Sequence, residues 1–399
     1  SIEVMNWYLS DASGNYRKFR IPTGRIPAGG YMTWDENDFN APEDLRISSY
    51  AGSDATAPTT VFRPGHGLST GDVITISGYA GTGAYNGTFE VTATGPDSFT
   101  IPAAFIDNHG TKGAYTRGEP FALSAQGDKV WLLEGNAQGH LLRFVDVVEF
   151  AAARASEALG RWPNGGGSET LVSMTAATFG AVNAPAQVGP VIISEVMYHP
   201  VATPENSFEY VELFNPGPAI ENLANWRIRG GVDFDFTADH SLNTGETILV
   251  VGFDPVTDLI SSTNFRSHYG IGPEVPLLGP WSDGPLRNDQ GIVRLQRPDM
   301  PPPTDPELYP QVTEDEVRYL ATAPWPAGPD GNGGSLHRVD PSLFGIFSSS
   351  WTGEPPSPGT GAAEISYADF RELTFGPGSP PGSSELEDFD LDGFLNICL

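Results

Sequence analysis

The sequence predicts an all-β protein built from one domain present twice, with a small β module inserted into the first copy. The 399 residues include 47 glycines and 36 prolines, which favours many short strands joined by turns over long helices. Hydrophobic residues make up 39% of the chain, enough for globular domains with their own cores. Collinear matches between the two halves of the sequence indicate the duplication.

The chain is strongly acidic, with 50 acidic and 21 basic residues and a formal net charge of −29. Such a surface repels phosphate backbones, so we expect no nucleic-acid partner. The sequence holds no run of about 18 apolar residues, so we expect no membrane insertion. Cys398 is the one cysteine, which excludes an intrachain disulfide and a thiolate metal cluster. This composition is typical of a bacterial extracellular or cell-surface protein.

Matching stretches recur in the same order in both halves of the chain. The matches are Trp7 with Trp226, 26–31 with 242–247, Val130 with Val293, and Trp162 with Trp325. The spacing between partners is nearly the same in the first two matches and is clearly shorter in the last two. The first copy therefore carries an insertion between its second and third matches.

The insertion has the pattern of a small all-β module. Within residues 59–102, apolar and polar side chains alternate through 73–77 and 89–94, as in half-buried strands. Asn86-Gly87 is a hairpin-turn dipeptide between them. We therefore predict an inserted module at 55–117, which resembles short β modules of phage-tail and bacterial surface proteins.

Two strand-like stretches of the second copy, VIISEVMY and FEYVELFN, have no counterpart in the first copy. At the spacing that separates Trp7 from Trp226, their counterparts would precede Ser1. Uncovered core faces and unpaired strand edges are costly. We therefore expect either that this sequence is a piece of a longer protein, or that another segment fills the gap.

A set of motifs in the second copy points to one family. They are IISEVMYHP (192–200), FEYVELFNP (208–216), Asn225-Trp226, and SLHRVDP (335–341). With these motifs the second copy resembles the lamin-tail domain in its bacterial secreted form. The resemblance implies an immunoglobulin-like β-sandwich for each copy and a mainly non-catalytic interaction role. The implied domains are 1–182, incomplete at its start; 190–360, complete; and 361–399, a Pro/Gly-rich linker, a short helix and a truncated calcium-type loop.

Side-chain patterns in the second copy predict individual elements. In FEYVELFN, Val211 and Leu213 point to one face of a strand, and Tyr210 and Phe214 point to the other. Both faces are partly apolar, as expected of a strand that lies between a core and covering loops. The other predictions are a strand at 247–251, a core position for Trp226, and short helices at 264–269 and 367–373.

Candidate catalytic patterns are weak. Residues 67–71 match G-x-S-x-G, but that nucleophile turn requires a helix after it and a strand pattern follows, so we predict a hairpin turn. The seven histidines lack the i, i+4 spacing of a zinc helix. Glu195, Glu209 and Glu212 fall on two strands that the family resemblance places side by side. Paired carboxylates could perform acid–base chemistry, but we favour a structural network.

Two acidic stretches are candidate cation sites. Residues 35–38 form an acidic loop that we interpret as solvated, although its oxygens could bind a cation. The tail has the pattern D-x-D-x-D-G-x-x-N, which suits calcium and resembles the loops of dockerin and thrombospondin type 3 repeats. Leu399 replaces the acid expected at loop position 12, which removes the bidentate ligand. The predicted calcium ligands are Asp388, Asp390, Asp392 and Asn396.

These observations favour a non-catalytic, extracellular binding or adhesion region of a larger bacterial protein. We expect its ligand to be a polysaccharide or another surface protein, with Tyr79, Tyr85 and Trp281 as exposed rings that stack on sugars. One alternative is a hydrolase that uses carboxylates or a bound cation at a sandwich edge. Another is a structural assembly subunit that is completed by a strand from a neighbour.

Overall fold

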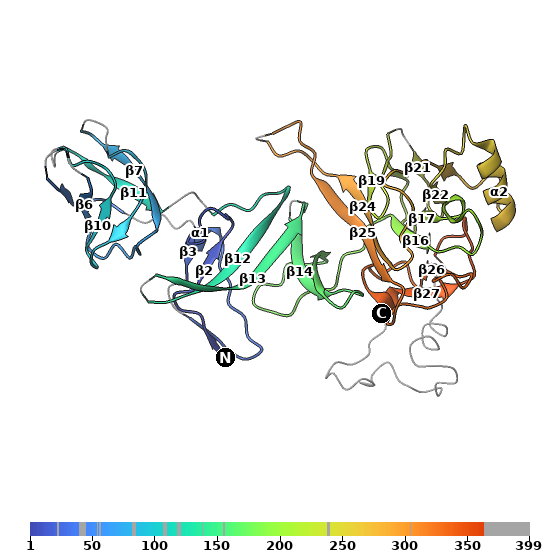
Figure 1. Cartoon of the computed structure of the whole chain (residues 1–399), viewed down its shortest axis with the longest axis horizontal. Helices are drawn as coiled ribbons and strands as arrows, with labels where there is room; N and C mark the ends of the chain where they lie inside the picture. Colours follow the sequence, from blue (N-terminus) through green and yellow to red (C-terminus); the bar gives the residue numbers. More distant parts are fainter. Residues whose placement is uncertain are drawn as a thin grey trace. The chain divides into compact units, whose positions relative to one another are not determined.

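A computed structural model shows an all-β chain, as predicted, that divides into two compact units (Figure 1). The first unit comprises 1–161, 171–185 and 299–312, and the second comprises 162–170, 186–298 and 313–399. In the described part of the chain, no helix is long and apolar enough to cross a membrane. The described residues are 1–362 except 22–23, 40–44, 54, 56, 82–84, 107–109, 118–120, 138, 155, 238–239 and 304.

The second unit is a β-sandwich. Its larger sheet has six strands in the order β23-β22-β17-β16-β26-β27, and its smaller sheet has the order β20-β19-β24-β25. In the larger sheet β22 and β23 run parallel, and the other neighbouring pairs described are antiparallel. The bounds are β16 Ile192–Met197, β17 Tyr210–Phe214, β19 Arg227–Gly230, β20 Phe234–Asp235, β22 Thr247–Val251, β23 Leu277–Leu278, β24 Gln290–Pro298, β25 Gln311–Leu320, β26 Ser335–Arg338 and β27 Trp351–Glu354.

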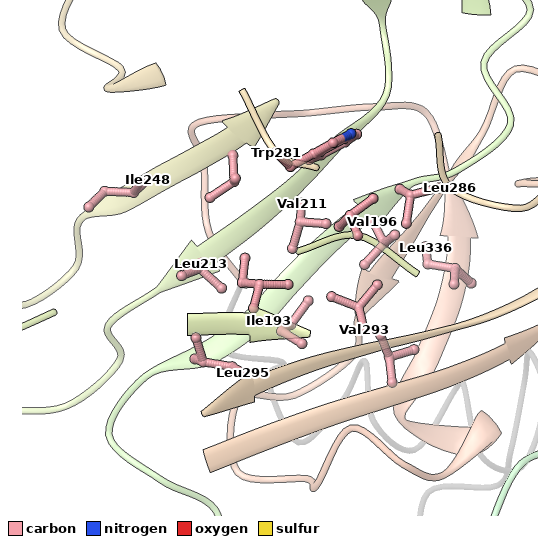
Figure 2. Packing of buried hydrophobic residues seen from close by; sticks show 14 of the residues in the cluster. Ile193, Val196, Val211, Leu213, Ile248, Trp281, Leu286, Val293, Leu295 and Leu336 are labelled. Atoms are coloured by element: carbon pink, nitrogen blue, oxygen red, sulfur yellow. The ribbon is translucent and has the colours of Figure 1, made fainter. Parts of the chain in front are cut away.

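The main core lies between these two sheets. Figure 2 shows the inward side chains of β16 and β17, among them Val196 and Val211, gathered with Val293 and Leu295 of β24. All four are fully buried. Trp226 belongs to the same cluster, as the sequence predicted. Hydrophobic burial of this kind is the main favourable contribution to folding.

The opposite face of the six-stranded sheet carries a second core. Tyr210 and Leu249 pack there against Phe265 of the helix α2 (Leu259–Tyr269). Tyr210 thus lies on the face opposite Val211, which confirms the predicted alternation along β17. The helix predicted at 264–269 is present and begins earlier, where the Asp258 side chain accepts the Ser261 N–H at 3.0 Å.

Gly270 ends α2 in the left-handed conformation, with φ of 67°. A Cβ at this position would meet no atom within 4 Å, so backbone conformation alone sets the cost of a side chain. We expect Gly270→Ala to lower the unfolding free energy of the second unit by about 1 kcal/mol in urea denaturation. Ser267→Ala, at an exposed position of the same helix, should leave it unchanged within a few tenths. Equal effects of the two changes would contradict this.

The first unit contains a four-stranded sheet that matches the smaller sheet of the second unit. Its order, β13-β12-β2-β3, corresponds strand for strand to β25-β24-β19-β20. Leu9 pairs with Leu132 here, as Ile228 pairs with Leu295 there, so the register also agrees with the spacing of the sequence matches. The bounds are β2 Tyr8–Ser10, β3 Phe19–Arg20, β12 Gly127–Gly135 and β13 Leu141–Ala151.

The turn before β2 repeats the turn before β19 in detail. Asn6 and Asn225 both adopt positive φ, at 68° and 64°. The Trp7 N–H donates to Val4 at 3.1 Å, and the Trp226 N–H donates to Leu223 at 3.0 Å. The small flanking pairs correspond too: β1 (Ile2–Glu3) with β4 (Arg25–Ile26), and β18 (Glu221–Asn222) with β21 (Ser241–Leu242).

The inserted segment forms two sheets around its own core, with the orders β5-β6-β10-β9 and β11-β7-β8. Leu45 and Ile47 belong to this core, and Arg46 bridges Ala114, so the module begins ahead of the predicted residue 55. The bounds are β5 Ser49–Ala51, β6 Thr59–Phe62, β7 Val73–Tyr79, β8 Gly87–Glu90, β9 Thr92–Ala93, β10 Ser98–Ile101 and β11 Lys112–Arg117, with β14 Ala158–Pro163 and β15 Glu169–Met174 further along the chain.

Candidate functional site

Two of the glutamates singled out in the sequence meet in the six-stranded sheet of the second unit. Glu195 on β16 pairs in register with Glu212 on β17, and on its other side with His337 on β26. A register shift between Ile193 and Glu195 marks a β-bulge. We call Ser194, Glu195, Glu212, Ser335 and His337 the carboxylate cluster.

Glu195 is the centre of the carboxylate cluster and is 1% exposed. Its Oε1 accepts hydrogen bonds from the Tyr210 hydroxyl, from Ser335 Oγ at 2.5 Å and from the Ser357 N–H at 3.1 Å. His337 Nε2 lies 3.2 Å from the same oxygen. Several donors converging on one buried oxygen supply the compensation that burial of a carboxyl group requires.

Glu212 is fully buried and has its own donors. Ser194 Oγ donates to Oε1 at 2.6 Å, and the Gly359 N–H donates to Oε2 at 2.6 Å. Gly359 belongs to the segment that follows β27. The two glutamates therefore hold this segment in place through hydrogen bonds from Ser357 and Gly359. The backbone of the segment in turn covers the carboxylate cluster.

Burial shapes the proton affinities of the cluster. It raises the pKa of Glu212 to about 7, and the negative charge of Glu195 adds to that rise. Burial alone would lower the pKa of His337, but the hydrogen bond and charge of Glu195 outweigh it, so the pKa of His337 is raised. Raised carboxyl pKa values are found at catalytic acids and in buried structural networks alike.

The arrangement is not that of a serine–histidine–acid relay. Ser335 Oγ lies 2.8 Å from Nε2 of His337, and the Glu195 carboxylate contacts that same nitrogen. A relay needs the nucleophile and the acid on opposite ring nitrogens. With Ser335 fully buried as well, the cluster has the geometry of a structural network.

Glu209 stands apart from this cluster. Its carboxylate accepts the Leu286 N–H at 3.0 Å and is 1% exposed. Burial raises its pKa to about 7, and the charge of Glu205 contributes to the rise. Of the three predicted glutamates, the fold thus brings two together and leaves the third with a partner of its own.

A buried ion pair that the sequence analysis missed lies beside the bulge of β16. Asp315 on β25 and Arg338 on β26 are both fully buried and hydrogen-bonded to each other. Asp315 also accepts the Ile193 N–H at 2.8 Å, while Arg338 donates to the Ile193 carbonyl. Trp351 lies against the guanidinium at 4.6 Å. Arg338 in the SLHRVDP motif could have indicated a buried charge. Its partner Asp315 could not be predicted, because no sequence spacing links the two residues.

The proposed sugar-stacking residues are not exposed, so that prediction is wrong. Tyr79, Tyr85 and Trp281 are 4%, 0% and 8% exposed. The Tyr85 ring stacks on Tyr50 at 4.3 Å inside the module, and Trp281 lies in the main core of the second unit. Their large apolar rings stabilise these cores, which outweighs the cost of covering one polar atom.

The remaining candidates also have structural roles or cannot be placed. Gly67–Gly71 leads into strand β7 and not into a helix, as predicted, but the predicted hairpin is wrong, because β6 and β7 on either side belong to different sheets. The predicted acidic loop at 35–38 leads into one helical turn, α1 (Glu36–Phe39), and Asp35 and Asp38 each accept the other's backbone N–H. Within the described residues, no group of three acidic, His or Cys side chains could hold a metal. The calcium loop (Asp388, Asp390, Asp392, Asn396) and the predicted helix 367–373 lie outside the described residues.

An open pocket of about 720 Å³ lies on the first unit at one end of β12. Trp131 lines it and is half-buried, with its ring edge-on to Tyr16 at 5.6 Å. Lys129 and Glu149 at its rim pair at 2.7 Å. Further lining residues are Asp11, Gln126, Asp128 and Phe150.

Comparison with known proteins gives one family match. The family model of the lamin tail domain matches residues 184–272, which carry strands β16 to β22 and helix α2 of the second unit. No curated protein sequence matches the chain.

Two solved structures show limited similarity to this chain. A DUF4876 family protein from Bacteroides thetaiotaomicron is 10% identical, with 82% of this chain and 94% of that chain covered and a TM-score of 0.26. The phage phi92 endosialidase is 10% identical, with 69% and 51% covered and a TM-score of 0.16.

Proposed function

We propose that this chain is a non-catalytic, extracellular binding region of a larger bacterial protein, and that its ligand is a polysaccharide or another surface protein. The observation that carries the proposal is the burial and internal hydrogen bonding of the two paired glutamates, which leaves neither carboxyl group open to a substrate. Glu195 and Glu212 are buried, accept hydrogen bonds from internal donors, and are covered by the backbone at Ser357 and Gly359. The lamin-tail match at 184–272 supports an interaction role.

The pocket beside Trp131 is the surface that we propose for a sugar. A half-buried indole with carboxylates and an ammonium around it offers both stacking and hydrogen bonds to hydroxyl groups. It takes the place of the three buried rings that the sequence suggested. A protein ligand that binds the acidic surface would instead bind outside this pocket. Its affinity would then not change when pocket residues are substituted.

For a polysaccharide that the unchanged chain binds, we expect Trp131→Ala to raise the dissociation constant about tenfold through loss of stacking. This factor is equivalent to ~1.4 kcal/mol of binding free energy. The measurement is a pulldown isotherm on insoluble cellulose, chitin and xylan. Phe179→Ala is the matched control, since Phe179 is 78% exposed and does not line the pocket. If the wild-type chain binds none of these polymers, the polysaccharide proposal fails and a surface protein becomes the ligand to test.

Hydrolysis is the second candidate, because two carboxyl groups with pKa values of about 7 resemble tuned acid–base residues. Its test is the release of soluble sugar from the same polymers. Release that is lost in Glu212→Gln would replace the binding proposal with the catalytic one. Binding without release would leave the carboxylate cluster with its structural role.

We further propose that the acidic tail binds calcium, on the strength of its D-x-D-x-D-G pattern alone. Pulldown with about 5 mM calcium and with a chelator tests it, since these conditions bracket the weak affinity of about 10⁻³ to 10⁻⁴ M typical of extracellular loops. Asp390→Asn should remove any calcium dependence and leave calcium-free binding unchanged.

A further inference from the structure

The four-stranded sheet of the first unit presents an apolar face that its counterpart in the second unit buries. Leu9, Val130, Leu132 and Val148 share this face, because Leu132 pairs with Leu9 and Val130 pairs with Val148 in register. All four are only half-buried. In the described part of the chain, the three hydrophobic core clusters lie in the inserted module and the second unit, and none includes a residue of this sheet.

The equivalent residues of the second unit show what this face normally packs against. The four counterparts in the second unit are all fully buried. They are, in the order Leu9, Val130, Leu132 and Val148, the residues Ile228, Val293, Leu295 and Val317. The residues that cover them include Val191, Ile193 and Val196 of the β16 segment, and Val211 and Leu213 of β17.

A polar anchor is repeated along with the apolar residues. DVVEF (146–150) on β13 matches DEVRY (315–319) on β25, so Asp146 corresponds to Asp315. Asp315 accepts the Ile193 N–H at 2.8 Å and so holds β16 at its bulge. Asp146 pairs with Leu132, which places it on the half-buried face, and its carboxylate bonds Arg161 at 2.8 Å.

We propose that this face of the sheet β13-β12-β2-β3 binds a partner polypeptide as a pair of antiparallel strands with the inward residues of β16 and β17. Leu9, Val130, Leu132 and Val148 supply the apolar contact, and Asp146 receives a backbone N–H of the incoming strand. Burial of the four side chains is the driving force, and the register shared by the two units fixes the geometry. The surface differs from the candidate site and needs no sugar ligand.

The test adds such a strand pair and asks whether it covers the face. A copy of residues 186–219 is fused directly before Ser1, which places it as far ahead of Trp7 as the original lies ahead of Trp226. In a Cys398→Ser background, Val148→Cys then provides a single thiol on the proposed surface. Val147→Cys is the matched control, since Val147 pairs with Trp131 on the opposite face and is 52% exposed. Val130→Cys is a second reporter should Val148→Cys fold poorly.

We expect the fusion to slow maleimide labelling at position 148 at least tenfold and to leave position 147 unchanged. A fusion whose copy carries Val196→Glu and Val211→Glu should give no protection, because charges cannot be buried against this face. Equal labelling with and without the fusion would overturn the proposal. So would protection in the unfused chain that grows with protein concentration, because a second copy would then be the occupant.

Discussion

Replacing Asp315 by alanine is expected to cost the second unit about 3–5 kcal/mol of unfolding free energy, the largest effect of any change considered. Asp315 and Arg338 are both fully buried, so the change leaves a guanidinium without its carboxylate in the interior. Burial already lowers the pKa of Arg338, and the charge of Asp315 opposes that effect. The backbone N–H groups of Ile193 and Gly345 would also lose their acceptor.

Urea denaturation followed by tryptophan fluorescence measures this effect, because Trp351 lies on the guanidinium. Asp289→Ala is the matched control: Asp289 pairs with Arg287 at 2.9 Å, but both side chains are about two-thirds exposed. Solvent screens such a pair, so no measurable change is expected from its removal. Similar losses from the two variants would show that burial does not set the strength of the Asp315 pair.

The stability of the second unit is expected to fall as the pH rises from about 5 to 8. The pKa of Glu212 is about 7 in the fold, whereas an unfolded glutamate titrates near 4.3. The folded state therefore retains a proton that the unfolded state has released, and stability decreases as the pH rises through 7. This shift corresponds to roughly 3 kcal/mol for Glu212. The raised pKa values of Glu209 and His337 have the same sign.

Denaturation curves at a series of pH values test this, with Glu212→Gln as the diagnostic variant. Glutamine cannot ionise, and its amide oxygen can still accept the Gly359 N–H, so the contribution of Glu212 to the pH slope should vanish while stability near pH 5 is retained. The slope should fall to about half and not to zero, because Glu209 keeps its own pKa of about 7. Glu274→Gln, at an exposed position, should keep the full slope. A slope in Glu212→Gln as steep as that of the unchanged chain would mean that Glu212 does not hold a proton in the fold.

Local sequence patterns predicted the elements of the fold well because they depend on local periodicity. The alternation along FEYVELFN placed Val211 and Tyr210 on opposite faces, since successive side chains of a strand point to opposite faces. The sequence predicted covering loops on the second face, where the structure has a second core with α2. The apolar run at 247–251 is β22. The start of the inserted module was harder to place, because Leu45 and Ile47 reach its core through pairing that no local pattern encodes.

Side-chain depth could not be predicted in the same way. Tyr79, Tyr85 and Trp281 lie close to turn-like residues in the sequence, but the chain folds back over each of them. The Asp315–Arg338 pair was missed because its partners, distant in the sequence, meet only when β25 and β26 are placed in their sheets. The convergence of Glu195 with Glu212 was anticipated, but not its enclosure by Ser357 and Gly359.

The sequence by itself determined the strand-rich architecture, the acidic surface, the spacing of the repeat and the alternating faces of β17, because each depends on composition or on order along the chain. Only the tertiary structure decided which polar groups are buried and which aromatic rings remain accessible. These properties depend on contacts between residues far apart in the sequence. Burial in turn sets the pKa of Glu212, so the chemistry of the carboxylate cluster follows from packing and not from the motif.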